Sequence, residues 1–148
     1  MKNSAVDILL VDDREDGLIA LEAILQNPRY NLIKVRSGKD ALVEVAKTNF
    51  AVILLDVQMP EMDGFETALR IRQMPESKYV PIIFVTAINK DDSYVFKGYQ
   101  AGAVDYIFKP VDENILRSKV SVFVDLFEKK CYCKIISCYR WSLIYSKN

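Results

Sequence analysis

The sequence predicts an α/β domain in which five helices alternate with the strands of a doubly wound, five-stranded parallel sheet. Three short runs, at residues 8–11, 51–55 and 81–85, consist entirely of apolar residues. Such runs, without polar alternation, are typical of strands that are buried on both faces of a parallel sheet. Segments with helical spacing separate them, and this alternation favours right-handed crossovers that place helices on both faces.

Two weaker runs, at residues 31–35 and 105–108, complete the predicted sheet. Polar residues interrupt both of them. Interrupted runs suit the edges of a sheet, because central strands of parallel sheets read as nearly continuous apolar segments. With the two polar strands at the edges, the strand order 2-1-3-4-5 is favoured.

Signals for five helices lie between and after these strands. The first helix ends before Pro28, Ser37 can cap the second, and Gly102 can end the fourth in a left-handed conformation. The expected helices cover about residues 14–26, a segment after Ser37, a segment after the turn at 59–64, about residues 91–101, and about residues 112–130.

Composition excludes several classes of function. The chain has 148 residues, which is room for one domain and a short additional segment. Its 20 Lys and Arg residues balance 20 Asp and Glu residues, so no net charge attracts nucleic acid or an anionic membrane. No apolar run approaches the ~18 residues of a membrane helix. With no signal-peptide pattern either, we expect a cytoplasmic location and no membrane partner.

Charged and polar residues stand where the predicted strands end. Asp12 and Asp13 follow the first strand, and Asp56 follows the third. Thr86 ends the fourth strand, and Lys109 follows the fifth. Open parallel sheets bind ligands outside the carboxyl ends of their strands, where the strand order reverses. We therefore expect these five side chains to converge on one crevice.

These residue types suit phosphoryl transfer. Neighbouring carboxylates repel one another unless a cation joins them, and their hard oxygens suit Mg²⁺. Asp56, on the central strand, is the best placed nucleophile, and its product would be an acyl phosphate. Lys109 and Thr86 can contact oxygens of the phosphoryl group. The chain has no histidine, which excludes histidine-dependent nucleophilic catalysis and imidazole metal sites.

Four motifs, each at a predicted strand end, carry a family resemblance. They are Leu10-Val-Asp-Asp13, Leu54-Leu-Asp-Val-Gln-Met-Pro-Glu-Met-Asp-Gly64, Val85-Thr-Ala87 and Tyr106-Ile-Phe-Lys-Pro110. With these motifs, residues 6–128 strongly resemble the receiver domains of two-component response regulators. The resemblance implies a flavodoxin-like fold and a phosphorelay switch rather than a turnover enzyme. It fits a chemotaxis-regulator-like domain, and it also fits the receiver module of a larger hybrid or multidomain signalling protein.

The resemblance also implies a metal site and a phosphoacceptor. Asp56 would accept the phosphoryl group, and Mg²⁺ would be bound by Asp13, Asp56 and the backbone carbonyl of Gln58. Asp12 would act mainly through a coordinated water. Ile88, which has no polar atom to orient a hydrolysing water, predicts slow loss of the phosphoryl group.

Further roles follow from the same resemblance. Thr86 and Lys109 would contact the phosphoryl group, and Tyr106 would turn inward when Thr86 moves. The Lys109–Pro110 peptide bond is expected to be cis. Because the chain lacks histidine, the donor would be a partner histidine kinase or phosphotransfer protein that docks near the first helix.

The fourth helix, fifth strand and fifth helix would present the phosphorylated state to a partner or to a second copy of the chain. The last helix carries more apolar residues than one face requires, so this surface is a candidate for a homodimer. No nucleic-acid partner is expected for this chain.

Three alternatives remain open at this point. A phosphohydrolase of the haloacid-dehalogenase type needs an acid two residues after the nucleophile, and Gln58 stands there instead. A phosphate-independent interaction module would not need the complete set of acids with Thr86 and Lys109. A flavin-binding protein needs a hydroxyl-rich phosphate loop after the first strand, where this chain has an acidic segment at residues 12–16.

The chain divides into an expected receiver domain at residues 1–130 and a tail at residues 131–148. The tail holds all three cysteines, Cys131, Cys133 and Cys138, together with the only tryptophan. Three thiolates are one short of the usual structural zinc site, and their odd number argues against a closed disulfide set. The tail lacks clear helical spacing and is not expected to belong to the domain.

Overall fold

A five-stranded parallel sheet with the order β2-β1-β3-β4-β5 forms the centre of the protein, as the sequence predicts. The computed structural model describes residues 5–87, 100, 102, 103 and 105–145, with the backbone alone from residue 130 onward. The helix expected at about residues 91–101 and the side chain of Ile88 lie outside the described residues.

Strands and helices alternate as expected from β1 to β4, and α5 follows β5. The strands are β1 (Val6–Val11), β2 (Tyr30–Val35), β3 (Val52–Leu55), β4 (Ile82–Thr86) and β5 (Asp105–Phe108). The helices are α1 (Glu15–Leu25), α2 (Gly38–Lys47), α3 (Gly64–Gln73), the short 3-10 helix η1 (Pro75–Ser77) and α5 (Glu113–Tyr145).

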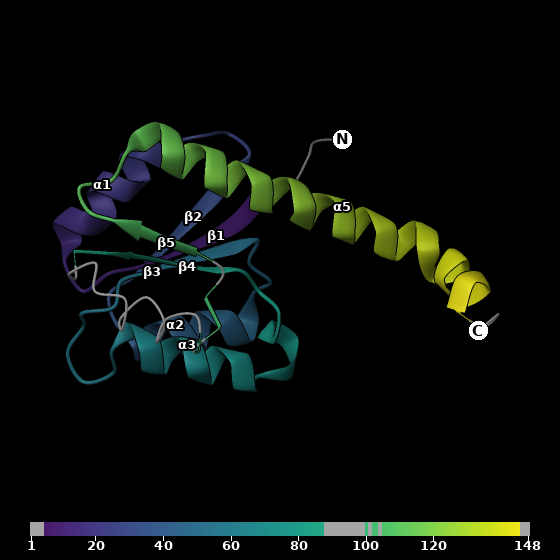
Figure 1. Ribbon diagram of the computed structural model, residues 1–148, viewed down its shortest axis with the longest axis horizontal. Coiled ribbons are helices and arrows are strands. Elements are labelled where there is room, and N and C mark those ends of the chain that lie inside the picture. The colour runs from purple at the N-terminus through teal and green to yellow at the C-terminus, as the bar shows by residue number, and fades with distance from the viewer. Residues whose placement is uncertain (1–4, 88–99, 101, 104, 146–148) are drawn as a thin grey trace.

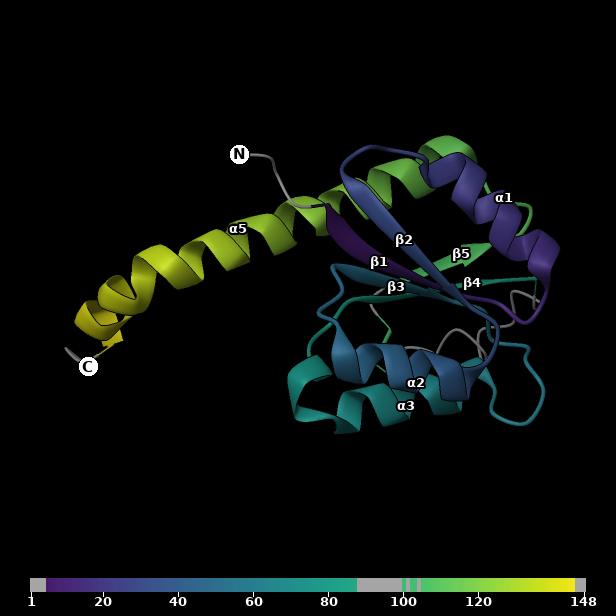
Figure 2. The same ribbon diagram turned by 180° about the vertical axis from the view of Figure 1, so that it is seen from behind.

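Helices cover both faces of the sheet and create two apolar layers (Figures 1 and 2). On one face, Leu9, Ile53 and Phe84 pack with residues of α2 and α3. On the other face, Leu10, Leu54 and neighbouring strand residues pack with α1 and α5. Because alternate residues of a strand point to opposite faces, the continuous apolar runs of the central strands supply both layers at once.

Local signals in the sequence explain where the helices begin. The Ser37 hydroxyl accepts a hydrogen bond from the backbone N–H of Asp40 at 3.0 Å, which confirms its predicted role as the cap of α2. Asp63 caps α3 in the same way through the N–H of Glu66 at 2.9 Å. Gly102 has φ 97°, the left-handed conformation predicted for it.

The last helix differs from the prediction. The sequence suggests an end at about residue 130 and no helical spacing beyond it, but α5 runs for 33 residues and ends at Tyr145. Residues 131–145 contain no glycine or proline, so no residue in this segment breaks the helix. Arg29 fastens α5 to the sheet layer through Asp125 at 3.3 Å and Glu128 at 2.8 Å. Beyond these contacts the helix projects away from the sheet (Figures 1 and 2).

Packing of α5 on the sheet gives a test of the fold. Leu116 is fully buried, whereas its neighbour Ile115 is 49% exposed. We expect Leu116→Ala to lower the free energy of unfolding by about 2–5 kcal/mol, because it leaves a cavity in the core. Ile115→Ala should change it by less than about 1 kcal/mol. Urea unfolding of both variants measures the difference, and equal losses would contradict this packing.

Candidate functional site

The register of the strands brings the predicted site residues to one edge of the sheet. Val11 of β1 lies opposite Leu55 of β3, so the residues that follow them, Asp12 and Asp56, leave the sheet side by side. The backbone N–H of Asp56 donates to the carbonyl of Val11 at 3.0 Å and fixes this pairing. On the other side, the N–H of Lys109 donates to the carbonyl of Thr86 at 3.0 Å.

Three carboxylates meet at this edge. One oxygen each from Asp12, Asp13 and Asp56 lie within 4.8 Å of one another. Asp12 and Asp56 are buried, with exposed fractions of 1% and 6%, whereas Asp13 lies nearer the solvent. An all-oxygen cluster of this kind is typical of Mg²⁺ sites and fits that ion better than a metal that prefers nitrogen or sulfur ligands.

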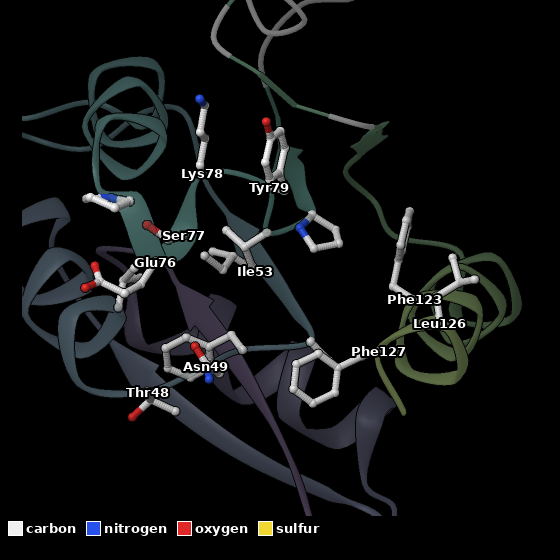
Figure 3. A pocket seen from close by; sticks show the side chains of 16 residues that line it. Thr48, Asn49, Ile53, Glu76, Ser77, Lys78, Tyr79, Phe123, Leu126 and Phe127 are labelled. Atoms are coloured by element: carbon white, nitrogen blue, oxygen red, sulfur yellow. The ribbon is translucent and has the colours of Figure 1, made fainter. Parts of the chain in front are cut away.

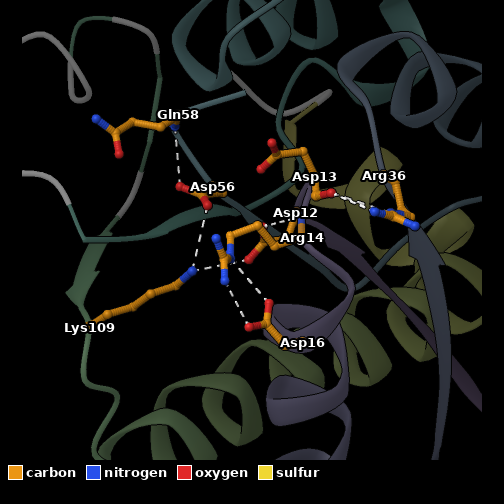
Figure 4. Close-up of polar contacts among 8 residues, drawn as sticks. All are labelled: Asp12, Asp13, Arg14, Asp16, Arg36, Asp56, Gln58 and Lys109. Carbon is orange, nitrogen blue, oxygen red and sulfur yellow. Dashed lines mark hydrogen bonds and ion pairs between the residues drawn. The ribbon is translucent and has the colours of Figure 1, made fainter. Parts of the chain in front are cut away.

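Lys109 brings a positive charge into the acid cluster from the end of β5. Its ammonium lies 3.1 Å from Asp12 Oδ2 and 3.6 Å from Asp56 Oδ2 (Figure 4). The Lys109–Pro110 peptide bond is cis, as expected. Lys109 therefore bridges the acid that ends β1 and the acid that ends β3.

The pKa of Asp56 reflects its crowded position. Burial raises this pKa above its ordinary value, and the charge of Asp12 raises it further. The Lys109 charge, the backbone N–H of Gln58 and the Thr86 hydroxyl oppose that rise without cancelling it. Asp56 is thus a carboxylate whose negative charge is poorly compensated in the absence of a further cation.

For the pKa of Lys109, the neighbouring acids outweigh the effect of burial. Burial acts to lower it, but the hydrogen bond to Asp12 and the charges of Asp56 and Asp12 outweigh burial and raise the pKa. Lys109 therefore stays protonated and keeps a positive charge beside the acids.

The remaining predicted residues are Gln58, Thr86 and Tyr106. The backbone N–H of Gln58 donates to Asp56 Oδ1 at 3.2 Å, while the Gln58 side chain is exposed and points away from the acids (Figure 4). Thr86 is fully buried at the end of β4. Tyr106 is partly buried, and its ring lies 5.4 Å from Phe84 and stacks on Phe108 at 5.2 Å, between centroids.

Two arginines reach the site that the sequence did not single out. The Arg36 guanidinium donates to the carbonyl of Asp13 at 3.0 and 3.3 Å (Figure 4). The backbone N–H of Arg14 donates to Asp12 Oδ1 at 3.0 Å. A signal for Arg36 existed, because it follows β2, which pairs with β1, and so its place beside Asp13 follows from the predicted strand order.

A separate cavity of about 350 Å³ opens at the opposite end of the sheet (Figure 3). The loop before β3, the loop between η1 and β4, and Phe123 and Phe127 of α5 line it. These loops precede their strands, so the cavity lies away from the carboxyl edge that carries the acids. It takes no part in the site.

The length and apolar character of the helices indicate whether one of them could cross a membrane. Within the described part of the chain, none of them combines the length and the apolar character that crossing a membrane requires.

Comparison with known proteins identifies the family. The family model for the response regulator receiver domain matches residues 8–121. This chain therefore belongs to the response regulator receiver domains. Members of this family are phosphoacceptor switches of two-component signalling that work with histidine kinases, and they are not turnover enzymes.

Individual relatives agree with the family. The chain is 39% identical over 118 residues to a Vibrio cholerae protein named "Probable cyclic di-GMP phosphodiesterase", covering 79% of this chain and 26% of that protein. It is 34% identical over 113 residues to the response regulator PleD of Caulobacter vibrioides, covering 76% and 25%. The chain thus spans about a quarter of the length of these curated relatives, in which the receiver is one module of a larger protein.

A solved structure resembles the fold. The receiver domain of the sensor histidine kinase PA1611 from Pseudomonas aeruginosa has a TM-score of 0.75 and 29% identity, covering 82% of this chain and 99% of that one. Its structure has a magnesium ion coordinated in the active site cleft.

The raised pKa of Asp56 predicts a stability effect. The folded state holds the Asp56 proton more tightly than the unfolded state, so stability falls as the pH rises from about 3.9 through the raised folded pKa. Above that value the loss persists. With a chelator present at pH 7, we expect Asp56→Asn to raise the free energy of unfolding by about 1 kcal/mol.

The control is a carboxylate outside the cluster. Glu76 is exposed, so Glu76→Gln should leave the free energy of unfolding nearly unchanged at pH 7. The gain from Asp56→Asn should shrink as the pH falls and disappear below the unfolded pKa of about 3.9, where the wild-type carboxyl group is protonated in both states. A destabilised Asp56→Asn protein at pH 7 would contradict the electrostatic account.

Proposed function

We propose that this chain is a Mg²⁺-dependent phosphorelay switch that accepts a phosphoryl group on Asp56 from a partner histidine kinase or phosphotransfer protein. One observation carries the proposal: Asp56 is a buried carboxylate with poorly compensated charge, placed between two further acids and the Lys109 ammonium. The location that we propose is the cytoplasm, where such a kinase would meet the domain.

The acids form the proposed metal site. Asp13, Asp56 and the carbonyl of Gln58 would hold Mg²⁺, and Asp12 would bind one of its waters. The three carboxylates supply hard oxygen ligands within 4.8 Å of one another, which supports this assignment. When bound, Mg²⁺ would offset the negative charge of the acids and of the phosphoryl oxygens.

In the proposed transfer, an oxygen of the Asp56 carboxylate attacks the phosphorus of a phosphohistidine. The new P–O bond forms as the P–N bond breaks, and the imidazole leaves with the electron pair. Lys109 would contact one phosphoryl oxygen, since its ammonium already lies 3.6 Å from Asp56 Oδ2. Thr86 would donate to another oxygen from the adjacent strand.

The acyl phosphate adds about two negative charges at neutral pH, and we propose that this biases an existing two-state equilibrium. Thr86 would move toward the new oxygens, and Tyr106 would turn into the space that it leaves. The position of Tyr106 beside Phe84 on β4 supports such coupling. Repacking would change the face formed by the fourth helix, β5 and α5.

The side of α5 next to β5 supports this surface as the output or homodimer face. Lys119 of α5 binds Asp105 of β5, so this side of the helix lies against the edge strand. One turn before Lys119 and one turn after it, at helical spacing, lie Ile115 and Val122, which are 49% and 55% exposed. Exposed apolar side chains beside a sheet edge suit contact with a second copy or an output partner.

We also propose that the receiver domain occupies residues 1–130 and that residues 131–148 are not part of it. Phe127 packs against the core, and Glu128 binds Arg29, which supports a boundary just beyond them. The curated relatives are about four times longer than the matched region, which is in keeping with a receiver that is one module of a larger protein.

Incubation with acetyl phosphate and Mg²⁺, followed by intact-mass measurement, tests the switch. The wild type should gain one phosphoryl group, and Asp56→Asn should gain none. Asp40→Asn, which changes an exposed acid of α2, should gain it as the wild type does. Mass gain in Asp56→Asn would contradict the acceptor. Failure to bind both Mg²⁺ and beryllofluoride would contradict the switch itself.

Lys109 gives a second test, because its ammonium contacts the same carboxylates that would bind Mg²⁺. Removing the ammonium should strengthen Mg²⁺ binding, since it lies 3.1 Å from Asp12 and 3.6 Å from Asp56. We expect Lys109→Gln to lower the Mg²⁺ dissociation constant several-fold, by about 1 kcal/mol, and to slow phosphorylation. Lys39→Gln, at an exposed position of α2, should change neither. Calorimetric titration measures the Mg²⁺ dissociation constant of each variant, and the rate of mass gain with acetyl phosphate measures phosphorylation. Weaker Mg²⁺ binding by Lys109→Gln would refute the competition between the ammonium and Mg²⁺ for the acids.

A further inference from the structure

Gly17 lies inside α1, where glycine is not required by the backbone. It is the third residue of the helix, and its φ is not in the left-handed region that favours glycine. Glycine is also the poorest helix former after proline. The reason for a glycine at this position must therefore be the absence of its side chain.

The space beside Gly17 is filled by the Asp12 carboxylate. A Cβ at residue 17 would lie 2.9 Å from Asp12 Cγ and nearer still to Asp12 Oδ2, and real Cβ contacts are essentially never this short. The third nearest atom, Oδ1 at 3.4 Å, also belongs to Asp12. The three atoms nearest to such a Cβ thus all belong to Asp12, an acid of the proposed metal site.

Asp12 has little freedom to move away. It is 1% exposed, and both of its oxygens are engaged. Oδ1 accepts the backbone N–H of Arg14 at 3.0 Å, and Oδ2 accepts the Lys109 ammonium at 3.1 Å. A shift of the carboxylate by even part of an ångström away from residue 17 would lengthen these bonds.

From this geometry we propose that Gly17 is a positioning residue for the metal site. Because residue 17 has no side chain, the first turns of α1 leave room for the Asp12 carboxylate in the position where it contacts Lys109. Lys109 held by Asp12 is in turn kept from closing fully on Asp56, from which it is 3.6 Å away. A methyl group at residue 17 would displace Asp12 and release Lys109 toward Asp56, where it would compete with Mg²⁺. This inference rests on the proposed function of the acid cluster as a Mg²⁺ site.

The test compares Mg²⁺ affinity with stability in Gly17→Ala. We expect about a tenfold rise in the Mg²⁺ dissociation constant, measured by calorimetric titration, as is typical when a residue supporting metal ligands is lost. The urea midpoint should fail to rise, although alanine is the better helix former. Ala20→Gly, at an exposed position of the same helix, should lower the urea midpoint and leave Mg²⁺ affinity unchanged.

A double-mutant cycle shows whether Gly17 acts through Asp12. In an Asp12→Ala background, the three atoms nearest to the new methyl group are gone. Gly17→Ala should there raise the urea midpoint and leave the Mg²⁺ dissociation constant unchanged within twofold. The same change of affinity in both backgrounds would overturn the proposal.

Two failures remain distinguishable. If the wild type and Asp12→Ala both fail to bind Mg²⁺, the proposed metal site itself is wrong. If the wild type binds Mg²⁺ and Gly17→Ala binds it equally well or better, the metal site stands and the role of Gly17 is overturned.

Discussion

Electrostatic repulsion among three carboxylates confined to one crevice is the constraint on which this site depends. Oxygens from Asp12, Asp13 and Asp56 lie within 4.8 Å of one another, and two of these residues are almost fully buried. Such charges destabilise a fold unless cations or hydrogen-bond donors face them. The Lys109 ammonium and the backbone N–H groups of Arg14 and Gln58 supply part of that compensation. The rise in the pKa of Asp56 shows that it is incomplete.

The strands of the sheet contribute stability through apolar burial, whereas the electrostatic cost arises at their carboxyl ends. All four residues of β3 and all five of β4 are buried, and both apolar layers of the core draw on them. The charged residues of the site begin one step beyond the ends of β1, β3 and β5. Apolar burial in the strands can therefore offset the unfavourable charge at their carboxyl ends.

Contacts between distant parts of the chain hold the crevice in shape. Arg36 joins the segment after β2 to the carbonyl of Asp13, and Lys109 joins the end of β5 to Asp12 across 97 residues of sequence. At the far side of the domain, Arg29 fastens α5 through Asp125 and Glu128. Arg36 links segments that follow the neighbouring strands β2 and β1, whereas the long Lys109 side chain reaches from the end of β5 to Asp12 at the end of β1, with β3 and β4 between them in the sheet. The parallel topology thus decides which charges can meet.

The sequence by itself determined the sheet, its strand order and the five residues at the strand ends, Asp12, Asp13, Asp56, Thr86 and Lys109. This was possible because apolar runs and turn residues are local signals, and parallel strands align their carboxyl ends. The caps at Ser37 and Gly102 were readable for the same reason. The course of the last helix was not, since residues 131–145 lack a clear apolar spacing, although nothing in them breaks a helix.

Only the tertiary structure decided which atoms of these residues meet. The sequence indicates that Lys109 approaches the acids, but not that its ammonium lies closer to Asp12 than to Asp56. The strand order places Arg36 near Asp13, but the sequence does not reveal that the Arg36 guanidinium donates to the Asp13 carbonyl or that Gly17 leaves room for the Asp12 carboxylate. These arrangements depend on side-chain rotamers and on differences of less than an ångström between packed elements. No periodicity along the chain encodes such differences, because they arise from the packing of segments that are remote in sequence.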